Sequence, residues 1–236
     1  MFQGFTQQTV DFMWGIRFNN DRVWFEAHKQ DYQEHLYRPM KELCAQVYEA
    51  LGEEAARYGL KHKVCRIYRD ARRLHGQGPY KDHLWWSFEK PCDGDFSAQP
   101  VFWFELAPGG WSYGLGYYAA RASTMVKHRA RVDRDPKPLL ALAGKLAEQN
   151  EFVLDGPAYA REKSCPVPEL SEWYNKKSFS LIHEQSPLDE EIYSPALADR
   201  LTRGFRFLLP FYDYFVTLDG DGDVPPKQAH EAPVLP

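Results

Sequence analysis

The densest group of chemically active side chains lies in residues 66–81, RIYRDARRLHGQGPYK. Arginine suits bidentate binding of phosphate or carboxylate, and lysine adds a further positive charge. Gly76 and Gly78 would let backbone N–H groups approach an anion closely. The basic residues of the segment are Arg66, Arg69, Arg72, Arg73 and Lys81. The segment therefore predicts a pocket for a small anionic ligand, and the alternative is a network of arginine and aspartate that only braces a long loop.

The roles within this segment depend on its backbone. If residues 63–70 form a regular strand, Arg66 and Arg69 point to opposite faces. Arg69, Arg72 and Lys81 are then the better anion-binding set, and Arg66 is the structural member. Asp70 could hold an arginine in place or act as a base, and the neighbouring His83 is the other candidate for proton transfer. No motif fixes a reaction, so the sequence leaves open whether the protein is an enzyme.

Two other motifs have the wrong context for the chemistry they resemble. Residues 110–114 match GxSxG, but that motif needs a strand, a turn and a helix to expose its serine, and Ser112 lies in an aromatic strand pattern. Asp219, Asp221 and Asp223 resemble the start of a calcium loop, but the glycine and glutamate that complete such a loop are replaced by Val224 and His230. The histidines and cysteines show no metal-site spacing, so we expect neither a metal nor a cofactor.

Charge is distributed unevenly in a chain whose net charge is −4. Residues 61–90 hold eight Lys/Arg against three Asp/Glu, and residues 121–134 hold five against one. Local anion recognition fits this pattern better than a surface that binds nucleic acid throughout. The alternatives are a nucleic-acid-binding module or a protein-interaction domain. In the first, both basic segments form one stripe and Trp85, Trp86 or Tyr80 stacks on bases.

The pattern of elements predicts an α+β fold, with N-terminal helices packed on a mainly antiparallel sheet and further helices C-terminal. A central aromatic hairpin is expected from PVFWFEL (100–106), a Pro-Gly-Gly turn and WSYGLGYYA (111–119). Helices are expected at 6–17, 19–38, 39–52, 123–134, 136–150 and 194–214, and further strands at 63–70, 152–154 and 179–183. We expect one domain over residues 1–216 and a polar Gly/Pro-rich tail over 217–236.

Composition indicates an ordinary globular chain of 236 residues, with 44% hydrophobic, 26% charged and 15% aromatic side chains. The first residues, MFQGFTQQTV, show no targeting signal, and no apolar run approaches the roughly 20 residues of a membrane span. The four cysteines are far apart, which favours reduced thiols. We therefore expect a cytoplasmic protein with no membrane association, and its oligomeric state is left open.

Three motifs in order, NNxxxWF (19–25), RxxRDxR (66–72) and PYKxH (79–83), resemble a bacterial and fungal family of conserved hypothetical proteins of unknown function. The similarity spans about residues 5–214. The resemblance implies that these motifs form one unit, in which Asn19, Asn20 and Trp24 close the wall of the site. It adds Arg129 and Lys177 to the candidate ligand-binding residues. The full set is Arg66, Arg69, Arg72, Tyr80, Lys81, Asn19, Asn20, Trp24, Arg129 and Lys177.

This chain departs from the family pattern in the loop of the second motif. A basic residue is expected where Gln77 stands, and an aromatic residue where Arg73 stands. If a lysine at position 77 contacts an anion in relatives, Gln77 weakens that contact here. The sequence then leaves open whether this chain shares their ligand.

Overall fold

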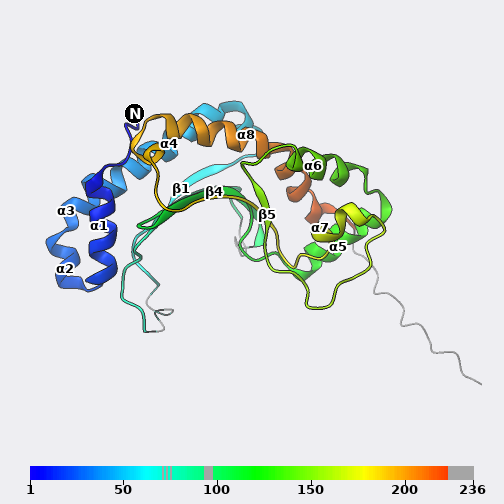
Figure 1. The fold of residues 1–236 in the computed structure, drawn as a ribbon, viewed down its shortest axis with the longest axis horizontal. Helices are drawn as coiled ribbons and strands as arrows, with labels where there is room; N and C mark the ends of the chain where they lie inside the picture. Colours follow the sequence, from blue (N-terminus) through cyan, green and yellow to red (C-terminus); the bar gives the residue numbers. More distant parts are fainter. Residues whose placement is uncertain (71, 73, 75, 93–97, 223–236) are drawn as a thin grey trace, which may run out of the picture.

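One antiparallel sheet of six strands carries the fold in the part of the chain that the structure describes (Figure 1). This computed structural model describes residues 1–70, 72, 74, 76–92 and 98–222. The strands are β1 (Lys61–Val64), β2 (Leu84–Glu89), β3 (Pro100–Ala107), β4 (Gly110–Tyr117), β5 (Val153–Asp155) and β6 (Ser180–Gln185). Their order is β1-β2-β3-β4-β6-β5, and every neighbouring pair is antiparallel. The predicted α+β fold is confirmed.

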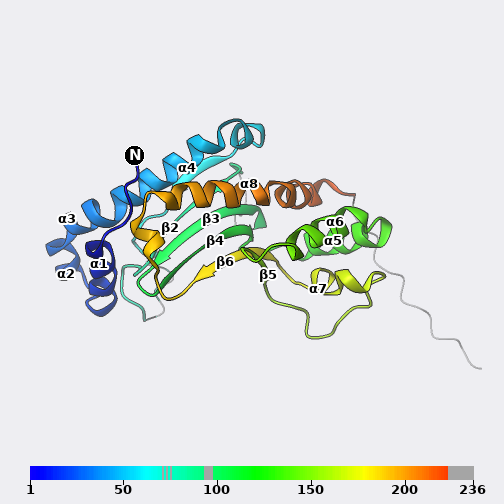
Figure 2. The same ribbon diagram turned by 45° about the horizontal axis from the view of Figure 1, so that its top comes forward.

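Helices cover one face of the sheet and both of its ends (Figures 1 and 2). They are α1 (Gln7–Phe18), α2 (Arg22–Ala27), α3 (Lys29–Asp31), α4 (Arg38–Arg57), α5 (Ala122–Arg134), α6 (Lys137–Ala147), α7 (Ser171–Tyr174) and α8 (Ala196–Val216). A π turn, Tyr32–Tyr37, and 3-10 turns at Pro168–Leu170, Glu190–Tyr193 and Leu218–Gly220 complete the set. α4 and α8 run side by side over the convex face, with α1–α3 at one end and α5–α7 at the other. No helix among the described residues is long and apolar enough to cross a membrane.

The aromatic hairpin is present as predicted, and it forms the centre of the sheet. Ala107 of β3 pairs with Gly110 of β4, so Pro108 and Gly109 make a two-residue turn. Four alternating residues of β4 are buried on the side of α8: Trp111, Tyr113, Leu115 and Tyr117. Ser112 lies inside the strand rather than at a strand-to-helix turn, so the GxSxG match has no nucleophile elbow.

The segment after β1 does not form the single strand expected over residues 63–70. β1 ends at Val64. The chain then pairs with a later part of the same segment rather than with β2. The Arg69 N–H donates to the Pro79 carbonyl (2.9 Å), and the Lys81 N–H donates to the Ile67 carbonyl (2.8 Å). The boundary was misplaced because a β-rich composition does not reveal which partner a backbone will find.

β2 was not predicted, although its sequence LWWSFE alternates clearly. Leu84, Trp86 and Phe88 are buried on the side of α4, whereas Trp85 and Glu89 are half-buried on the opposite face. Trp86, one of the residues expected to stack on nucleic-acid bases, is fully buried and stacks on Phe88. It therefore belongs to the core and cannot offer its ring to a base.

The N-terminal helices are more continuous than expected. Thr6 caps α1 as predicted, but the helical path does not stop at Pro39. The π turn Tyr32–Tyr37 leads directly into α4, whose first turn contains Pro39, a position where the missing N–H costs nothing. α4 kinks at Gly52 (φ 43°) and continues to Arg57, so glycine here bends the helix rather than ending it.

A half-buried network of charges fixes α8 to the sheet. Arg200 donates to both oxygens of Glu151 (3.0 and 3.2 Å), to Glu191 and to the Nε2 atom of His183 (3.2 Å). The Tyr113 hydroxyl also donates to Glu151. Burial alone would lower the pKa of Arg200, but its bonds to the two carboxylates raise it above its ordinary value. The network joins five parts of the chain that no local pattern connects.

We expect Arg200→Ala to destabilise the protein by about 2–3 kcal/mol, because it leaves the half-buried Glu151 and Glu191 without their partner. The control is Arg206→Ala on the same helix, whose pair with Glu54 is largely exposed and contributes less than about 1 kcal/mol. Urea unfolding of both variants measures the difference. Equal losses in the two variants would contradict a structural role for the Arg200 network.

Candidate functional site

The described residues of the 66–81 segment belong to a bent loop that the turn between α1 and α2 holds at Tyr80. The Asn20 amide donates to the Tyr80 carbonyl (2.9 Å), and its Oδ1 atom accepts the Tyr80 N–H (3.0 Å). Arg69 Nε donates to the same carbonyl (2.8 Å), and the buried Tyr80 ring stacks on Phe25. The structure thus brings Asn20, Arg69 and Tyr80 together. Their polar groups bind one another, as expected of a braced loop.

Asp70 and Arg72 form a local pair on the outside of this loop. Asp70 accepts hydrogen bonds from Nε (3.0 Å) and Nη2 (2.7 Å) of Arg72 and from its backbone N–H (3.0 Å). The hydrogen bonds that Arg72 donates to this carboxylate raise the pKa of Arg72, which is fully solvated. Asp70 therefore orients an arginine, as expected, but that arginine points into solvent. Arg73 lies outside the described residues.

Lys81 and His83 point to different partners. The Lys81 ammonium donates to the Arg66 carbonyl (2.7 Å), and burial, together with the nearby Arg69 and Arg66 charges, lowers its pKa. His83 bonds through Nδ1 to Asp82 (3.0 Å). The same carboxylate accepts Nε of Arg17, a residue of α1 (2.6 Å). His83 thus belongs to a cluster with Asp82 and Arg17, separate from the arginines of the 66–81 segment.

The remaining residues of the first and second motifs have local contacts. Asn19 donates to the Gly15 carbonyl (3.0 Å) at the end of α1, and Trp24 stacks on His28 (4.0 Å between ring centroids). Gln77 is exposed. Of the wall expected around the arginines, the structure places only Asn20 in hydrogen-bonding contact with the described part of the 66–81 segment.

Arg129 and Lys177 lie at the other end of the sheet and meet at Tyr159 (Figures 1 and 2). The guanidinium carbon of Arg129 lies 5.1 Å from the centroid of the Tyr159 ring, and its Nη1 donates to the hydroxyl (3.4 Å). The ammonium nitrogens of Lys163 and Lys177 lie 5.7 and 5.9 Å from the same centroid. Three cations from three segments therefore surround one aromatic ring.

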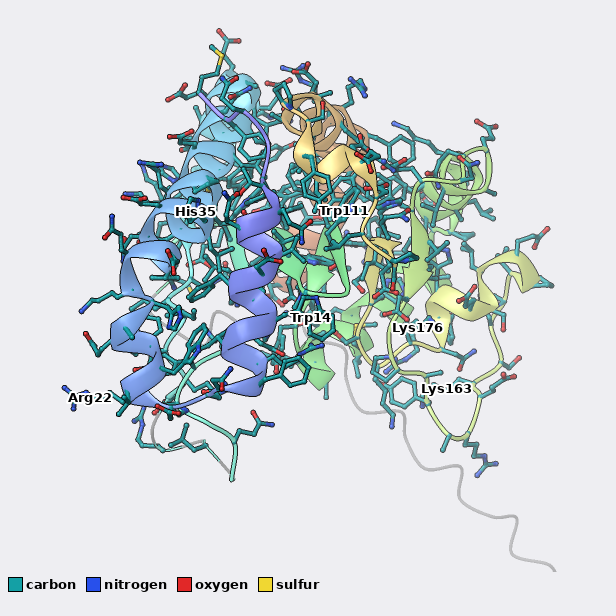
Figure 3. The ribbon with its side chains drawn as sticks, turned by 60° about the vertical axis from the view of Figure 1, so that its left-hand side comes forward. Trp14, Arg22, His35, Trp111, Lys163 and Lys176 are labelled. Atoms are coloured by element: carbon teal, nitrogen blue, oxygen red, sulfur yellow. The ribbon has the colours of Figure 1, made fainter. Side chains whose placement is uncertain are left out.

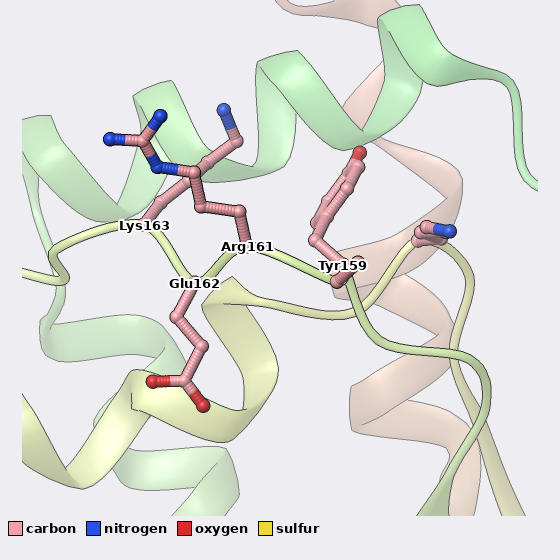
Figure 4. A pocket seen from close by; sticks show the side chains of 6 residues that line it. Tyr159, Arg161, Glu162 and Lys163 are labelled. Carbon is pink, nitrogen blue, oxygen red and sulfur yellow. The ribbon is translucent and has the colours of Figure 1, made fainter.

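These residues border a pocket of about 540 Å³, here called the Tyr159 pocket. Its lining residues are Tyr159, Ala160, Arg161, Glu162, Lys163 and Lys177, with Arg129 behind the tyrosine ring. Arg161 and Lys163 project to the same side as the Tyr159 hydroxyl, whereas the carboxylate of Glu162 points the opposite way (Figure 4). The side chains that share the Tyr159 side of this loop are therefore cationic.

The loop that carries Tyr159 is held by Asn175, which is buried at the end of α7. Asn175 Oδ1 accepts the Lys163 N–H (2.8 Å), and its amide donates to the Lys163 carbonyl (3.2 Å). Its carbonyl accepts the Tyr159 N–H (2.9 Å), and the Lys177 N–H donates to the carbonyl of Pro157 (2.7 Å). The backbone of the pocket is therefore fixed, while the side chains of Lys163 and Lys177 are exposed; Figure 3 marks the position of Lys163.

Arg129 is only 9% exposed, yet among the described residues no carboxylate lies within ion-pairing distance of Arg129, Lys163 or Lys177. The nearest acid on α5 is Asp133, one turn away, which accepts the Tyr174 hydroxyl (3.0 and 3.2 Å). A buried guanidinium without an anion is costly, because desolvation is not compensated. The Tyr159 pocket therefore holds an excess of positive charge.

The basic face of α5 is neutralised within the chain. Arg131 donates to both oxygens of Asp221 (2.7 and 2.8 Å), and Lys127 donates to the Asp219 carbonyl (2.9 Å). Arg134 lies 4.0 Å from Asp221. The start of the expected polar tail is thus bound to α5, whereas Asp223, Val224 and His230 lie outside the described residues. The 66–81 loop, which holds most of the first basic segment's arginines, and α5 of the second segment lie at opposite ends of the sheet (Figure 1), so these charges do not form one stripe.

Tyr159, Arg161 and Lys163 were missed in the sequence. The signal was the alternation YAREK (159–163) after a Gly-Pro turn, which places two cations and an aromatic ring at every second residue. Nothing in that pattern indicates that Arg129 and Lys177 would come to the same ring. The network of Glu151 and Arg200 was missed for the same reason.

We expect Asn20→Ala to destabilise the protein by about 1–3 kcal/mol, because it leaves the Tyr80 N–H without its partner and the Tyr80 carbonyl with Arg69 alone. Asn19→Ala is the matched control, since the exposed Asn19 makes a single bond at a helix end. Urea unfolding measures both variants. If Asn19→Ala costs as much as Asn20→Ala, the clamp on Tyr80 is not the reason for the loss.

His128, the neighbour of Arg129 on α5, makes stability depend on pH. It is fully buried between the Trp173 carbonyl and the Tyr214 hydroxyl (both 3.2 Å), and burial lowers its pKa to about 4. Because the unfolded chain binds this proton near pH 6.5, the stability it contributes is complete above pH 6.5. Roughly 3 kcal/mol is lost as the pH falls to 4. His128→Phe should lose less stability than wild type over that interval in urea unfolding, and parallel curves would contradict this origin.

Comparison with known proteins identifies one family. Residues 8–214 match the family described as Conserved hypothetical protein (DUF2461). A search of curated proteins found no match. The match spans the chain from α1 to the end of α8 and so includes both the 66–81 loop and the Tyr159 pocket. The chain belongs to the conserved hypothetical protein family DUF2461.

Proposed function

We propose that the protein binds a small anionic ligand, bearing phosphate or carboxylate, in the Tyr159 pocket. The observation that carries this proposal is the buried Arg129, which shares the Tyr159 ring with Lys163 and Lys177 without a carboxylate in ion-pairing distance among the described residues. An anion in the pocket would compensate the desolvation of the guanidinium. Charge-assisted bonds of this kind are stronger than those between neutral groups.

The 66–81 segment is the second candidate for the same function. Arg66 and Arg72 are exposed, and Lys81 is half-buried beside them, so positive charge is concentrated there as well. Arg72 already has a carboxylate partner in Asp70, and Arg69 donates to a backbone carbonyl. Arg129, which is buried and has no carboxylate partner among the described residues, is therefore a stronger candidate for binding an anion than the arginines of this loop.

Binding, rather than a reaction, is the function proposed. Asp70 is bound to Arg72 and His83 to Asp82, and both lie in the loop at the opposite end of the sheet from Tyr159. Neither can therefore transfer a proton to a ligand held at Arg129. The nucleic-acid alternative is weaker, because Trp86 is buried and Arg131 is paired with Asp221.

Thermal unfolding with phosphate and with citrate tests the proposal. A ligand at about 100 times its Kd stabilises the native state by about 2.7 kcal/mol. In a chain of this size that raises Tm by roughly 5–10 °C. Lys163→Ala and Lys177→Ala should each weaken binding roughly tenfold, because each removes one charge-assisted bond.

Two further variants decide where the anion binds. Arg134→Ala, on α5 but away from Tyr159, is the control and should bind as wild type does. Arg66→Ala combined with Arg72→Ala should also leave binding unchanged. If neither anion raises Tm, the protein has no such site. If only the Arg66/Arg72 variant loses binding, the 66–81 loop is the site instead.

A further inference from the structure

We infer that the Tyr159 pocket selects a dianionic phosphate monoester over a carboxylate, and that the ester group of the ligand lies along the pocket wall. This rests on the proposed function, since it names the class of anion that the same site takes. Three properties of the pocket carry it: the number of its charges, the directions from which they come, and its size.

The charge of the pocket exceeds what one carboxylate can neutralise. Each of three cationic centres lies within 5.9 Å of the Tyr159 centroid, so no two of them are more than about 12 Å apart. A ring has two faces, so at least two of the cations share one. A dianion interacts about twice as strongly with this array as a monoanion at the same place. Glu162, the acidic residue of the lining, points to the other side of the loop (Figure 4), and against Arg129, Arg161, Lys163 and Lys177 it still leaves a net charge of +3.

The directions of the cations suit three terminal oxygens better than two. Arg129 comes from α5, Lys163 from the loop after β5, and Lys177 from the segment before β6. The backbone at both lysines is fixed, since the Lys163 backbone is hydrogen-bonded to Asn175 and the Lys177 N–H to the Pro157 carbonyl. Lys163 and Lys177 line the pocket, whereas Arg129 acts on it through the Tyr159 hydroxyl, to which its Nη1 donates. A phosphate monoester presents three tetrahedral acceptor oxygens, one for each lysine and one for this hydroxyl, whereas a carboxylate presents two in a plane.

The size of the pocket indicates that the phosphate carries an organic group. About 540 Å³ falls in the range that accommodates small organic ligands and is far more than a phosphate ion fills. The Tyr159 ring supplies apolar wall beside the cations. An ester group in contact with this wall would add affinity that inorganic phosphate lacks.

Calorimetry with three matched probes tests the charge and the shape separately. Phenyl phosphate, phenyl sulfate and benzoate carry the same ring, and only phenyl phosphate is a dianion at pH 7.5. We expect phenyl phosphate to bind at least about tenfold more tightly than phenyl sulfate, which should bind more tightly than planar benzoate. Inorganic phosphate should bind more weakly than phenyl phosphate.

Repeating the titrations at pH 5.0 tests the dependence of binding on the charge of the ligand. The second ionisation of a phosphate monoester lies near pH 6, so at pH 5.0 phenyl phosphate is mainly a monoanion and should bind about as weakly as phenyl sulfate. The titratable and charged groups around the pocket are Arg129, Asp133, Tyr159, Arg161, Glu162, Lys163, Cys165, Tyr174 and Lys177, with His128 buried behind it. Phenyl sulfate does not titrate between pH 5.0 and 7.5, so any change in its affinity reports these protein groups, and the phosphate effect is read relative to it.

The outcomes separate this inference from the proposed function. Lys163→Ala and Lys177→Ala lie on the surface and should fold normally, and each should reduce the preference for phosphate over sulfate several-fold. Equal affinity for benzoate and phenyl phosphate would overturn the preference for phosphate and leave anion binding intact. Inorganic phosphate binding as tightly as phenyl phosphate would overturn the ester. Failure of every probe to bind would refute the proposed function itself.

Discussion

The position of α8 depends on one aromatic side chain. The ring of Phe205 meets four rings of the sheet edge-on, at centroid distances of 5.4–5.8 Å, those of Trp86, Phe88, Phe102 and Tyr113. Because these rings come from β2, β3 and β4, Phe205 packs α8 against three neighbouring strands at once. The helices are thereby committed to one face of the sheet. The loops that carry the candidate ligand-binding residues leave the sheet at its two ends (Figure 1).

What could be predicted from the sequence follows from how local each signal is. The β3–β4 hairpin and α1 were predicted correctly, because alternation, turn residues and a cap lie within a few positions of one another. The boundary after Val64 was wrong, because the 66–81 loop pairs with itself rather than with β2. Pro39 was taken as the end of a helix, whereas a π turn before it lets the helical path continue.

The candidate site was even harder to predict from local sequence signals than the fold. Charges that are close in sequence drew attention to residues 66–81, but Arg72 finds Asp70 two residues away, and Arg69 bonds to the Tyr80 carbonyl. The excess charge arises instead where Arg129 and Lys163, 34 positions apart, meet at one ring. Arg129 and Lys177 were named as candidates from resemblance to a family, but only tertiary structure shows that both meet the Tyr159 ring and that Lys177 lines a ligand-sized space.

Three arginines on α5 and α8 are largely buried, and two of them have carboxylate partners. Arg200 is bonded to Glu151 and Glu191, and Arg131 to Asp221, so each guanidinium has a carboxylate with which it was desolvated. Arg129 is more buried than either and has a tyrosine hydroxyl instead. The same desolvation that the carboxylates offset for the first two arginines is not offset by a charge at the third. In the described chain no carboxylate is within ion-pairing distance of Arg129, and this is why the proposed anion is placed beside it.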